Sequence, residues 1–158
     1  MGAPANENQV VRVEDTADTA LLTRETAFLK HLEFIQAAIT RQAGNSSLIR
    51  GWALTLATAL FGFSAHSPGS GIAAIALIPT VAFYVLDAYY LRQERLFRCL
   101  YTAVIAPGSR VPALSMDVSP YRDAAEVQWR AVLRSRPLLV LYGFILAAGV
   151  IVVILTAI

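Results

Sequence analysis

The sequence predicts an all-α membrane protein with three transmembrane helices. Hydrophobic residues make up 56% of its 158 positions and charged residues only 15%, whereas soluble domains carry about 25% charged residues. Three long apolar stretches, at 48–65, 72–90 and 136–158, approach or reach the ~20 residues with which a helix crosses a bilayer. Every basic residue lies before the first stretch, at its edge, or between the second stretch and the start of the third. This one-sided charge is typical of a multi-pass protein.

The first 45 residues are polar enough to stay in the cytoplasm. Residues 1–18 lack periodicity and are rich in Asn, Asp, Glu and Thr, which predicts a flexible tail. Residues 19–45 place apolar side chains at helical spacing and predict an amphipathic helix. Three partners fit its apolar stripe: another cytoplasmic helix of the same chain, a second copy of the chain, or the membrane surface. The stripe consists of Leu21, Leu22, Phe28, Leu29, Leu32, Ile35 and Ile39.

Residues 46–91 are predicted to form a transmembrane hairpin. The stretch "GNSS" at 44–47 predicts a break before it, because Gly and Asn suit the end of one helix and Ser suits the start of the next. The first span, 48–65, and the second, 72–90, are joined by the uncharged turn "HSPGSG" at 66–71.

The first span carries a stripe of small residues that predicts close helix packing. The stripe does not indicate whether the partner helix belongs to the same chain. Arg50 and Trp52 extend the short span, because such side chains reach into the membrane interface. The predicted packing residues are Arg50, Gly51, Thr55, Thr58 and Gly62.

The segment 92–135 between the second and third spans is predicted to be cytoplasmic and helical. Its prolines divide it into a helix to about Ile105, a loop, and a short helix at 121–135. The positive-inside rule then places the N-terminus in the cytoplasm and the C-terminus, after the span 136–158, in the periplasm. Arginine supplies twelve of the thirteen basic residues and alanine is abundant, which favours a GC-rich bacterial genome and the bacterial inner membrane.

The second span contains an unusual polar stripe near its cytoplasmic end. Thr80, Tyr84 and Asp87 follow at i, i+4 and i+7 and therefore share one helical face. Two interpretations stand side by side. Asp87 pairs with Arg50, which the antiparallel first span brings to a similar depth; or the stripe lines or gates a pore in an oligomer, where a ring of carboxylates favours cations.

Two groups of cytoplasmic arginines also have two interpretations. The first group follows the second span directly, and the second surrounds Trp129. These side chains either meet lipid phosphates at the membrane surface or form a site for an anion or nucleotide. The candidate ligand-binding residues are Arg92, Arg95, Arg98, Arg130 and Arg134.

Several functional classes find no support in the sequence. It contains no phosphate loop and no GxGxxG, GxSxG or HExxH motif. His31 and His66 are predicted to lie on opposite sides of the membrane, and Cys99 is the only cysteine. We therefore predict neither an enzyme, nor a catalytic residue, nor a cofactor or metal site.

Three segments carry a resemblance to a known family: "LKHLEFIQAAITRQAGNSSLIRGWALTL", "FYVLDAYYLRQERLFRCLY" and "LSMDVSPY". Over roughly 25–145 the chain resembles small membrane effectors of nucleotidyltransferase-linked bacterial anti-phage systems, such as the channel effectors of Hailong systems. The resemblance implies a homo-oligomeric ion channel, with four subunits as the suggested number. It also implies gating by a nucleotide or oligonucleotide that the nucleotidyltransferase makes, and an abortive infection in which the channel depolarises the inner membrane.

The leading hypothesis is thus a gated channel, lined or gated by Thr80, Tyr84 and Asp87. Its partners would be further copies of itself, the lipid bilayer and the nucleotidyltransferase product, without a double-stranded nucleic acid target. The alternative is a small membrane scaffold that recruits a cytoplasmic partner protein through its amphipathic segments. Asp87→Asn separates them, because a channel should change conductance while a scaffold should lose little beyond stability.

Overall fold

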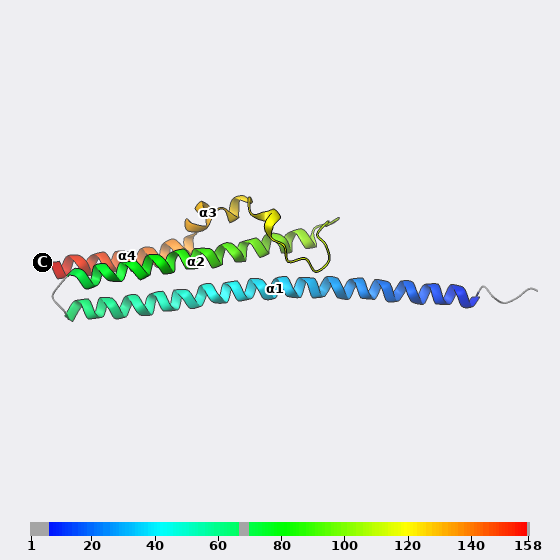
Figure 1. The fold of residues 1–158 in the computed structure, drawn as a ribbon, viewed down its shortest axis with the longest axis horizontal. Coiled ribbons are helices and arrows are strands. Elements are labelled where there is room, and N and C mark those ends of the chain that lie inside the picture. Colours follow the sequence, from blue (N-terminus) through cyan, green and yellow to red (C-terminus); the bar gives the residue numbers. More distant parts are fainter. Residues whose placement is uncertain (1–6, 67–69, 158) are drawn as a thin grey trace, which may run out of the picture.

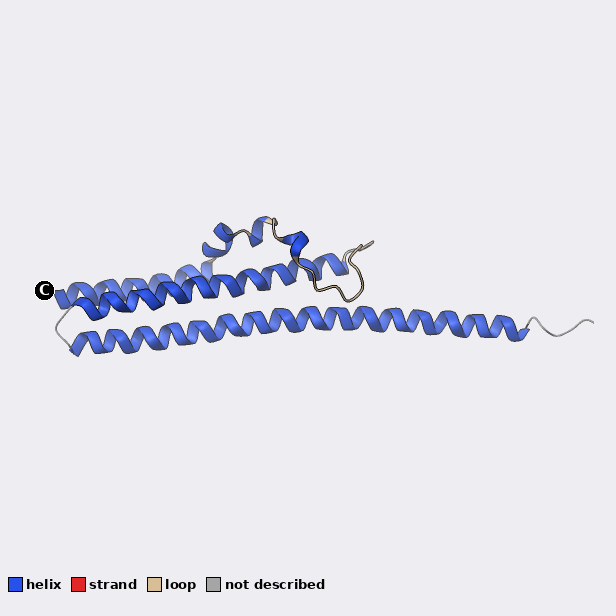
Figure 2. Ribbon diagram, in the orientation of Figure 1, coloured by secondary structure: helices blue, strands red, loops and turns tan. Residues whose placement is uncertain are grey.

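The computed structural model describes residues 7–66 and 70–157, which form helices joined by turns and loops (Figures 1 and 2). Two long antiparallel helices, α1 and α2, lie side by side, and α4 packs along α2 and the C-terminal part of α1. A short irregular segment with two 3-10 turns and α3 lies against the polar half of α2 (Figure 1). The elements are α1 Glu7–His66, α2 Ser70–Ile105, η1 Ser119–Tyr121, η2 Ala125–Val127, α3 Trp129–Leu133 and α4 Arg136–Ala157.

Helix α1 is one continuous helix of 60 residues, about 90 Å long at ~1.5 Å per residue. The predicted break at 44–47 is therefore wrong. Ser46 does not cap a new helix; it is buried and donates its hydroxyl to Asp87 of α2. The face of α1 packs on α2 from Ile35 to Ala57 without interruption, and such tertiary packing outweighs weak local stop signals.

The predicted flexible tail at 1–18 is also wrong from Glu7 onward, where α1 begins. Residues 7–43 contain neither Gly nor Pro, so nothing in this polar stretch interrupts a helix that later residues anchor. Residues 1–6 lie outside the described residues. In Figure 1 the N-terminal part of α1 extends well beyond the other helices.

Helix α2 joins the predicted second span and the following cytoplasmic helix without a break. Its end at Ile105 confirms the predicted end of the helix, which Pro107 and Gly108 explain: Pro107 cannot continue the hydrogen-bond ladder, and Gly108 adopts φ +72°. Within the predicted turn 66–71, residues 67–69 lie outside the described residues.

The predicted helix at 121–135 is wrong as a single element, because it is divided into η1, η2 and α3. Ala124 and Gln128 adopt extended backbone with ψ of 135° and 139°. Between them, the carbonyls of Glu126 and Val127 accept hydrogen bonds from arginine side chains of α2. The two carbonyls thus accept hydrogen bonds from arginine side chains in place of the backbone N–H groups that they would bind in a continuous helix.

Helix α4 agrees with the predicted third span. Within the described ranges 7–66 and 70–157 it is the one helix whose length and composition suffice to cross a membrane, over the 20 residues Arg136–Leu155 with a mean hydropathy of 3.0. The other two predicted spans are apolar parts of α1 and α2, each continuous with a polar part. The fold is thus all-helical as predicted, with one candidate span.

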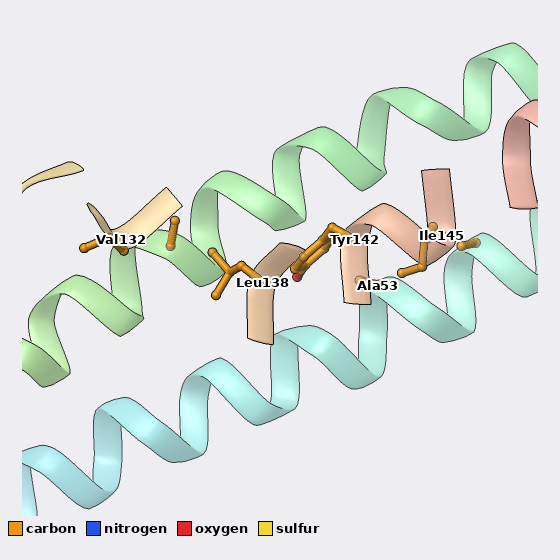
Figure 3. Close-up of a cluster of buried hydrophobic side chains, with 7 residues drawn as sticks. Ala53, Val132, Leu138, Tyr142 and Ile145 are labelled. Atoms are coloured by element: carbon orange, nitrogen blue, oxygen red, sulfur yellow. The ribbon is translucent and has the colours of Figure 1, made fainter. Parts of the chain in front are cut away.

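Two apolar clusters hold the helices together. The first joins α1, α2, α3 and α4 (Figure 3) and contains Ala53, Ala57, Ala88, Val132, Leu138, Tyr142 and Ile145. The second joins Ile35 and Ile39 of α1 to Leu100 and Val104 of α2. The amphipathic stripe of α1 therefore packs on the polar half of the chain's own α2 at this end, which matches one of the three predicted partners.

The small-residue stripe of α1 lies on the exposed surface of the chain. Gly51, Thr55, Thr58 and Gly62 are all exposed, and a Cβ added at either glycine would meet no atom within 4 Å. Close packing within the chain instead uses alanines, such as Ala57. Contact of the stripe with another copy of the chain stays a prediction.

Candidate functional site

The main polar cluster of the structure surrounds Asp87, whose side chain is 0% exposed. Arg50 Nε donates to Asp87 Oδ2 at 2.8 Å, and Arg50 Nη2 lies 3.4 Å from Oδ1. Ser46 donates its hydroxyl to Oδ1 as well. Because Ser46 and Arg50 are four residues apart, α1 presents both side chains on one face toward α2.

This geometry confirms the predicted Asp87–Arg50 ion pair. Removing a carboxylate from water costs several kcal/mol, roughly, unless charge and hydrogen bonds compensate it. Both Asp87 oxygens have a donor, so the cluster is compensated within one chain. The second interpretation, a ring of charge in an oligomeric pore, stays a prediction.

Thr80 and Tyr84 lie on the same face of α2 as Asp87, as predicted, and that face is turned toward the chain's own helices. Thr80 is 3% exposed. Tyr84 donates its hydroxyl to the Leu133 carbonyl at 2.7 Å and meets the ring of Tyr142 edge-on, with centroids 5.4 Å apart. Within one chain, Tyr84 thus faces α3 and α4, while Asp87 faces α1.

Tyr142 belongs to this site although the sequence reasoning did not select it. It extends from α4 into the space between α1 and α2 (Figure 3) and donates its hydroxyl to the Phe83 carbonyl at 3.3 Å. Ser46 was missed because its neighbours resemble helix caps. Its position four residues before Arg50 could have indicated it; for Tyr142 the sequence holds no comparable signal.

Two of the predicted ligand-binding arginines hold the chain together. Arg92 Nε donates to the Val127 carbonyl at 3.0 Å, and its guanidinium lies 5.2 Å from the centre of the Trp129 ring. Arg95 Nη1 donates to the Glu126 carbonyl at 2.7 Å. Both fasten the η2–α3 segment to α2. The sequence grouped Trp129 with the arginines that follow it, whereas the structure places the guanidinium of Arg92, from the other group, over its ring.

The other predicted arginines are more exposed. Arg98 pairs with Glu94 at 2.7 Å and its side chain remains 63% exposed. Arg130 and Arg134 are exposed on and beside α3. Of the five, only Arg95 and Arg98 line the cleft of about 730 Å³ beside α2, so the structure does not gather all five arginines into this cavity.

The cleft beside Arg95 and Arg98 also contains an acidic group. Cys99 donates its thiol to Glu126 Oε1 at 3.0 Å. Burial, and then the hydrogen bond and negative charge of Glu126, raise the pKa of Cys99 to about 11. The cleft therefore combines two guanidinium groups with one carboxylate and a protonated thiol.

His31 of α1 fastens the loop after Ile105 to that helix. It is 3% exposed, and its Nε2 lies 2.7 Å from the Ser115 carbonyl, so this nitrogen carries the proton and donates it.

Comparison with protein-family models, curated proteins and solved structures finds no match to this chain.

Proposed function

We propose that this chain is one subunit of a homo-oligomeric ion channel in the bacterial inner membrane. The observation that carries the proposal is an exposed apolar surface around an ion pair whose carboxylate, Asp87, is fully buried. Large apolar side chains are exposed on three helices that lie side by side, and surfaces of this extent mark membrane or protein contacts. They include Trp52, Leu54, Leu56 and Phe63 on α1, Ile75, Ile78, Val81 and Val85 on α2, and Leu139, Val140, Phe144 and Ile151 on α4.

In this proposal α4 and the apolar parts of α1 and α2 each cross the bilayer. The basic residues then lie at the end where α2 turns polar, beyond Asp87, and the positive-inside rule makes that end cytoplasmic. The N-terminus is accordingly cytoplasmic and the C-terminus periplasmic. The Ser46–Arg50–Asp87 cluster lies where the apolar and basic parts of the helices meet.

The role of Asp87 in conduction follows from its unequal pairing. An ionisable group at membrane depth is costly and is a candidate for an ion path. Asp87 is 0% exposed, whereas its partner Arg50 keeps 29% of its side chain exposed. Arg50 is therefore the side chain that can swing away on opening, leaving the carboxylate of each subunit to attract cations. Thr80 and Tyr84 would continue the path into the apolar region.

The biological setting is proposed from the sequence resemblance. It is an abortive-infection effector that depolarises the membrane under the control of a nucleotide or oligonucleotide. The exposed guanidinium groups of Arg98, Arg130 and Arg134, and Arg95 at the cleft, are available for an anionic ligand. Arg92 would contribute indirectly, by holding the η2–α3 segment in place.

The test is ion flux through liposomes that contain the purified protein. Wild type is compared with Asp87→Asn and with Glu33→Gln, a matched change of carboxylate to amide at the exposed Lys30–Glu33 pair. We expect cation flux with wild type and Glu33→Gln, and reduced or less selective flux with Asp87→Asn. The channel proposal would be contradicted if liposomes with correctly inserted wild-type protein show no ion flux, both with and without added mono- and oligonucleotides.

One observation favours the scaffold as a second candidate. Helix α1 extends past the other helices (Figure 1). Its N-terminal half also exposes apolar side chains: Leu21, Leu22, Phe28, Leu29 and Phe34 are 44–64% exposed. A cytoplasmic partner could bind this stripe as an amphipathic helix. A scaffold predicts that Leu22→Glu with Leu29→Glu abolishes function in cells that show no change of membrane potential.

A further inference from the structure

A small apolar cavity lies between α2 and α4, beside the polar cluster. Its volume is about 270 Å³, and Thr80, Val81, Tyr84, Leu139, Tyr142 and Leu146 line it together with Gly143. This volume is below the ~300–1,000 Å³ of most small-molecule sites. The cavity therefore suits one narrow chain rather than a ligand with several rings.

The mouth of the cavity lies on the outer apolar surface. Val81, Leu139 and Leu146 line it and are themselves 38–53% exposed, whereas Thr80 and Tyr142 at its inner end are 3% and 1% exposed. Gly143 contributes to the empty space of the cavity: it has no side chain, and a Cβ added there would meet no atom within 4 Å. The cavity thus runs from the surface of α4 inward toward α2.

The polar groups of the cavity wall are already engaged within the chain. Tyr84 donates its hydroxyl to the Leu133 carbonyl and Tyr142 donates to the Phe83 carbonyl, and Thr80 has an interaction of its own. A polar ligand would lose its hydration and find only hydroxyl oxygens whose protons are already used, a poor replacement for water. An aliphatic chain forms no hydrogen bonds and therefore loses none on entering the cavity. Its presence there keeps the apolar cavity wall away from water.

We propose that this cavity binds one acyl chain of a phospholipid from the surrounding bilayer. The inference rests on the proposed membrane embedding, and in particular on α4, whose 20-residue apolar segment contains Leu139, Gly143 and Leu146. The bound chain lies as a wedge between α2 and α4 and touches Tyr84 and Tyr142. It therefore contacts the same face of α2 that carries Asp87, so the bound chain and an open ion path along Thr80 and Tyr84 exclude one another.

The experiment uses a phospholipid with a photoreactive diazirine on its acyl chain, in membranes that contain the full-length protein. After irradiation, labelled residues are mapped by mass spectrometry. We expect labels on Thr80, Tyr84 or Tyr142 as well as on Phe144, which is 69% exposed on the outer surface of α4. Gly143→Phe, which fills the cavity, should remove the inner labels and keep the outer one.

Val140→Phe is the matched control, because Val140 is 73% exposed and does not line the cavity; it should keep the inner labels. A label on Phe144 with none on the three inner residues in wild type would overturn the acyl-chain site while leaving membrane embedding intact. The side chain of a second copy in the cavity would give this same result. Absence of all labels would overturn the embedding itself. The wild-type map alone decides between these outcomes if Gly143→Phe does not fold.

Discussion

Replacing Asp87 by Asn tests how much the buried ion pair stabilises the fold. Breaking a buried pair by removing one partner costs about 3–5 kcal/mol. Asn keeps the shape of Asp and can still accept the Arg50 Nε–H bond, so no cavity forms. Arg50 keeps 29% of its side chain exposed and can reach water or lipid phosphate. We therefore expect a loss near the lower end, about 3 kcal/mol.

Removing the cation of the pair should destabilise the fold more than removing the carboxylate. Arg50→Met leaves a carboxylate that is 0% exposed without its charged partner, and the loss should approach about 5 kcal/mol. In the double variant neither charge remains. Its loss should fall short of the sum of the single losses by about 3 kcal/mol, the upper end of measured coupling energies.

The assay is chemical unfolding of the protein in detergent micelles, followed by the helical circular dichroism signal. Glu33→Gln is the control, because the exposed i, i+3 pair of Glu33 with Lys30 should contribute only about 0.2–0.5 kcal/mol. Strictly additive losses in the double variant, or an Asp87→Asn variant as stable as Glu33→Gln, would refute the reasoning.

Three further predictions concern packing, reactivity and a hydrogen bond. Gly149→Ala should lower the thermal midpoint, because its Cβ would lie 2.7 Å from the Phe61 ring, whereas Gly143→Ala, with open space around its Cβ, should hold or raise it. The rate of Cys99 alkylation should keep rising about tenfold per pH unit toward pH 11, instead of levelling off near the ordinary thiol pKa of 9.0. Glu126→Gln should increase this rate at pH 8, because it removes the negative charge beside the thiol. Equal alkylation rates in folded and denatured protein would contradict the raised pKa of Cys99. Tyr84→Phe should destabilise by about 1–3 kcal/mol in the same unfolding assay, because a carbonyl of α3 loses its donor; no change would show that the bond contributes nothing.

The Asp87–Arg50 pair could be predicted from the sequence because antiparallel helices place residues at equal depth, and a buried carboxylate needs a cation. The end of α2 at Ile105 could be predicted because Pro107 and Gly108 carry their backbone preferences in the sequence itself. The end of α2 depends on the backbone preferences of two residues, and the ion pair depends on the positions of two charges along antiparallel helices. A single sequence contains both kinds of information.

The features that were missed depend on tertiary contacts. The continuity of α1 through 44–47 follows from packing on α2, which overrides the capping preferences of Gly44 and Ser46. Arg92 and Arg95 bind backbone carbonyls rather than acidic side chains. Because every residue carries a carbonyl, no pattern of side chains marks such partners.

The most direct test of the channel is the reversal potential of the purified protein in a planar bilayer. Across a roughly tenfold KCl gradient a perfectly cation-selective pore reverses at about 59 mV in magnitude. Wild type and the charge-retaining Asp87→Glu should reverse toward that value, and Asp87→Asn should move toward zero. A wild-type current with no cation preference, or one that Asp87→Asn leaves unchanged, would contradict the placement of Asp87 in an ion path.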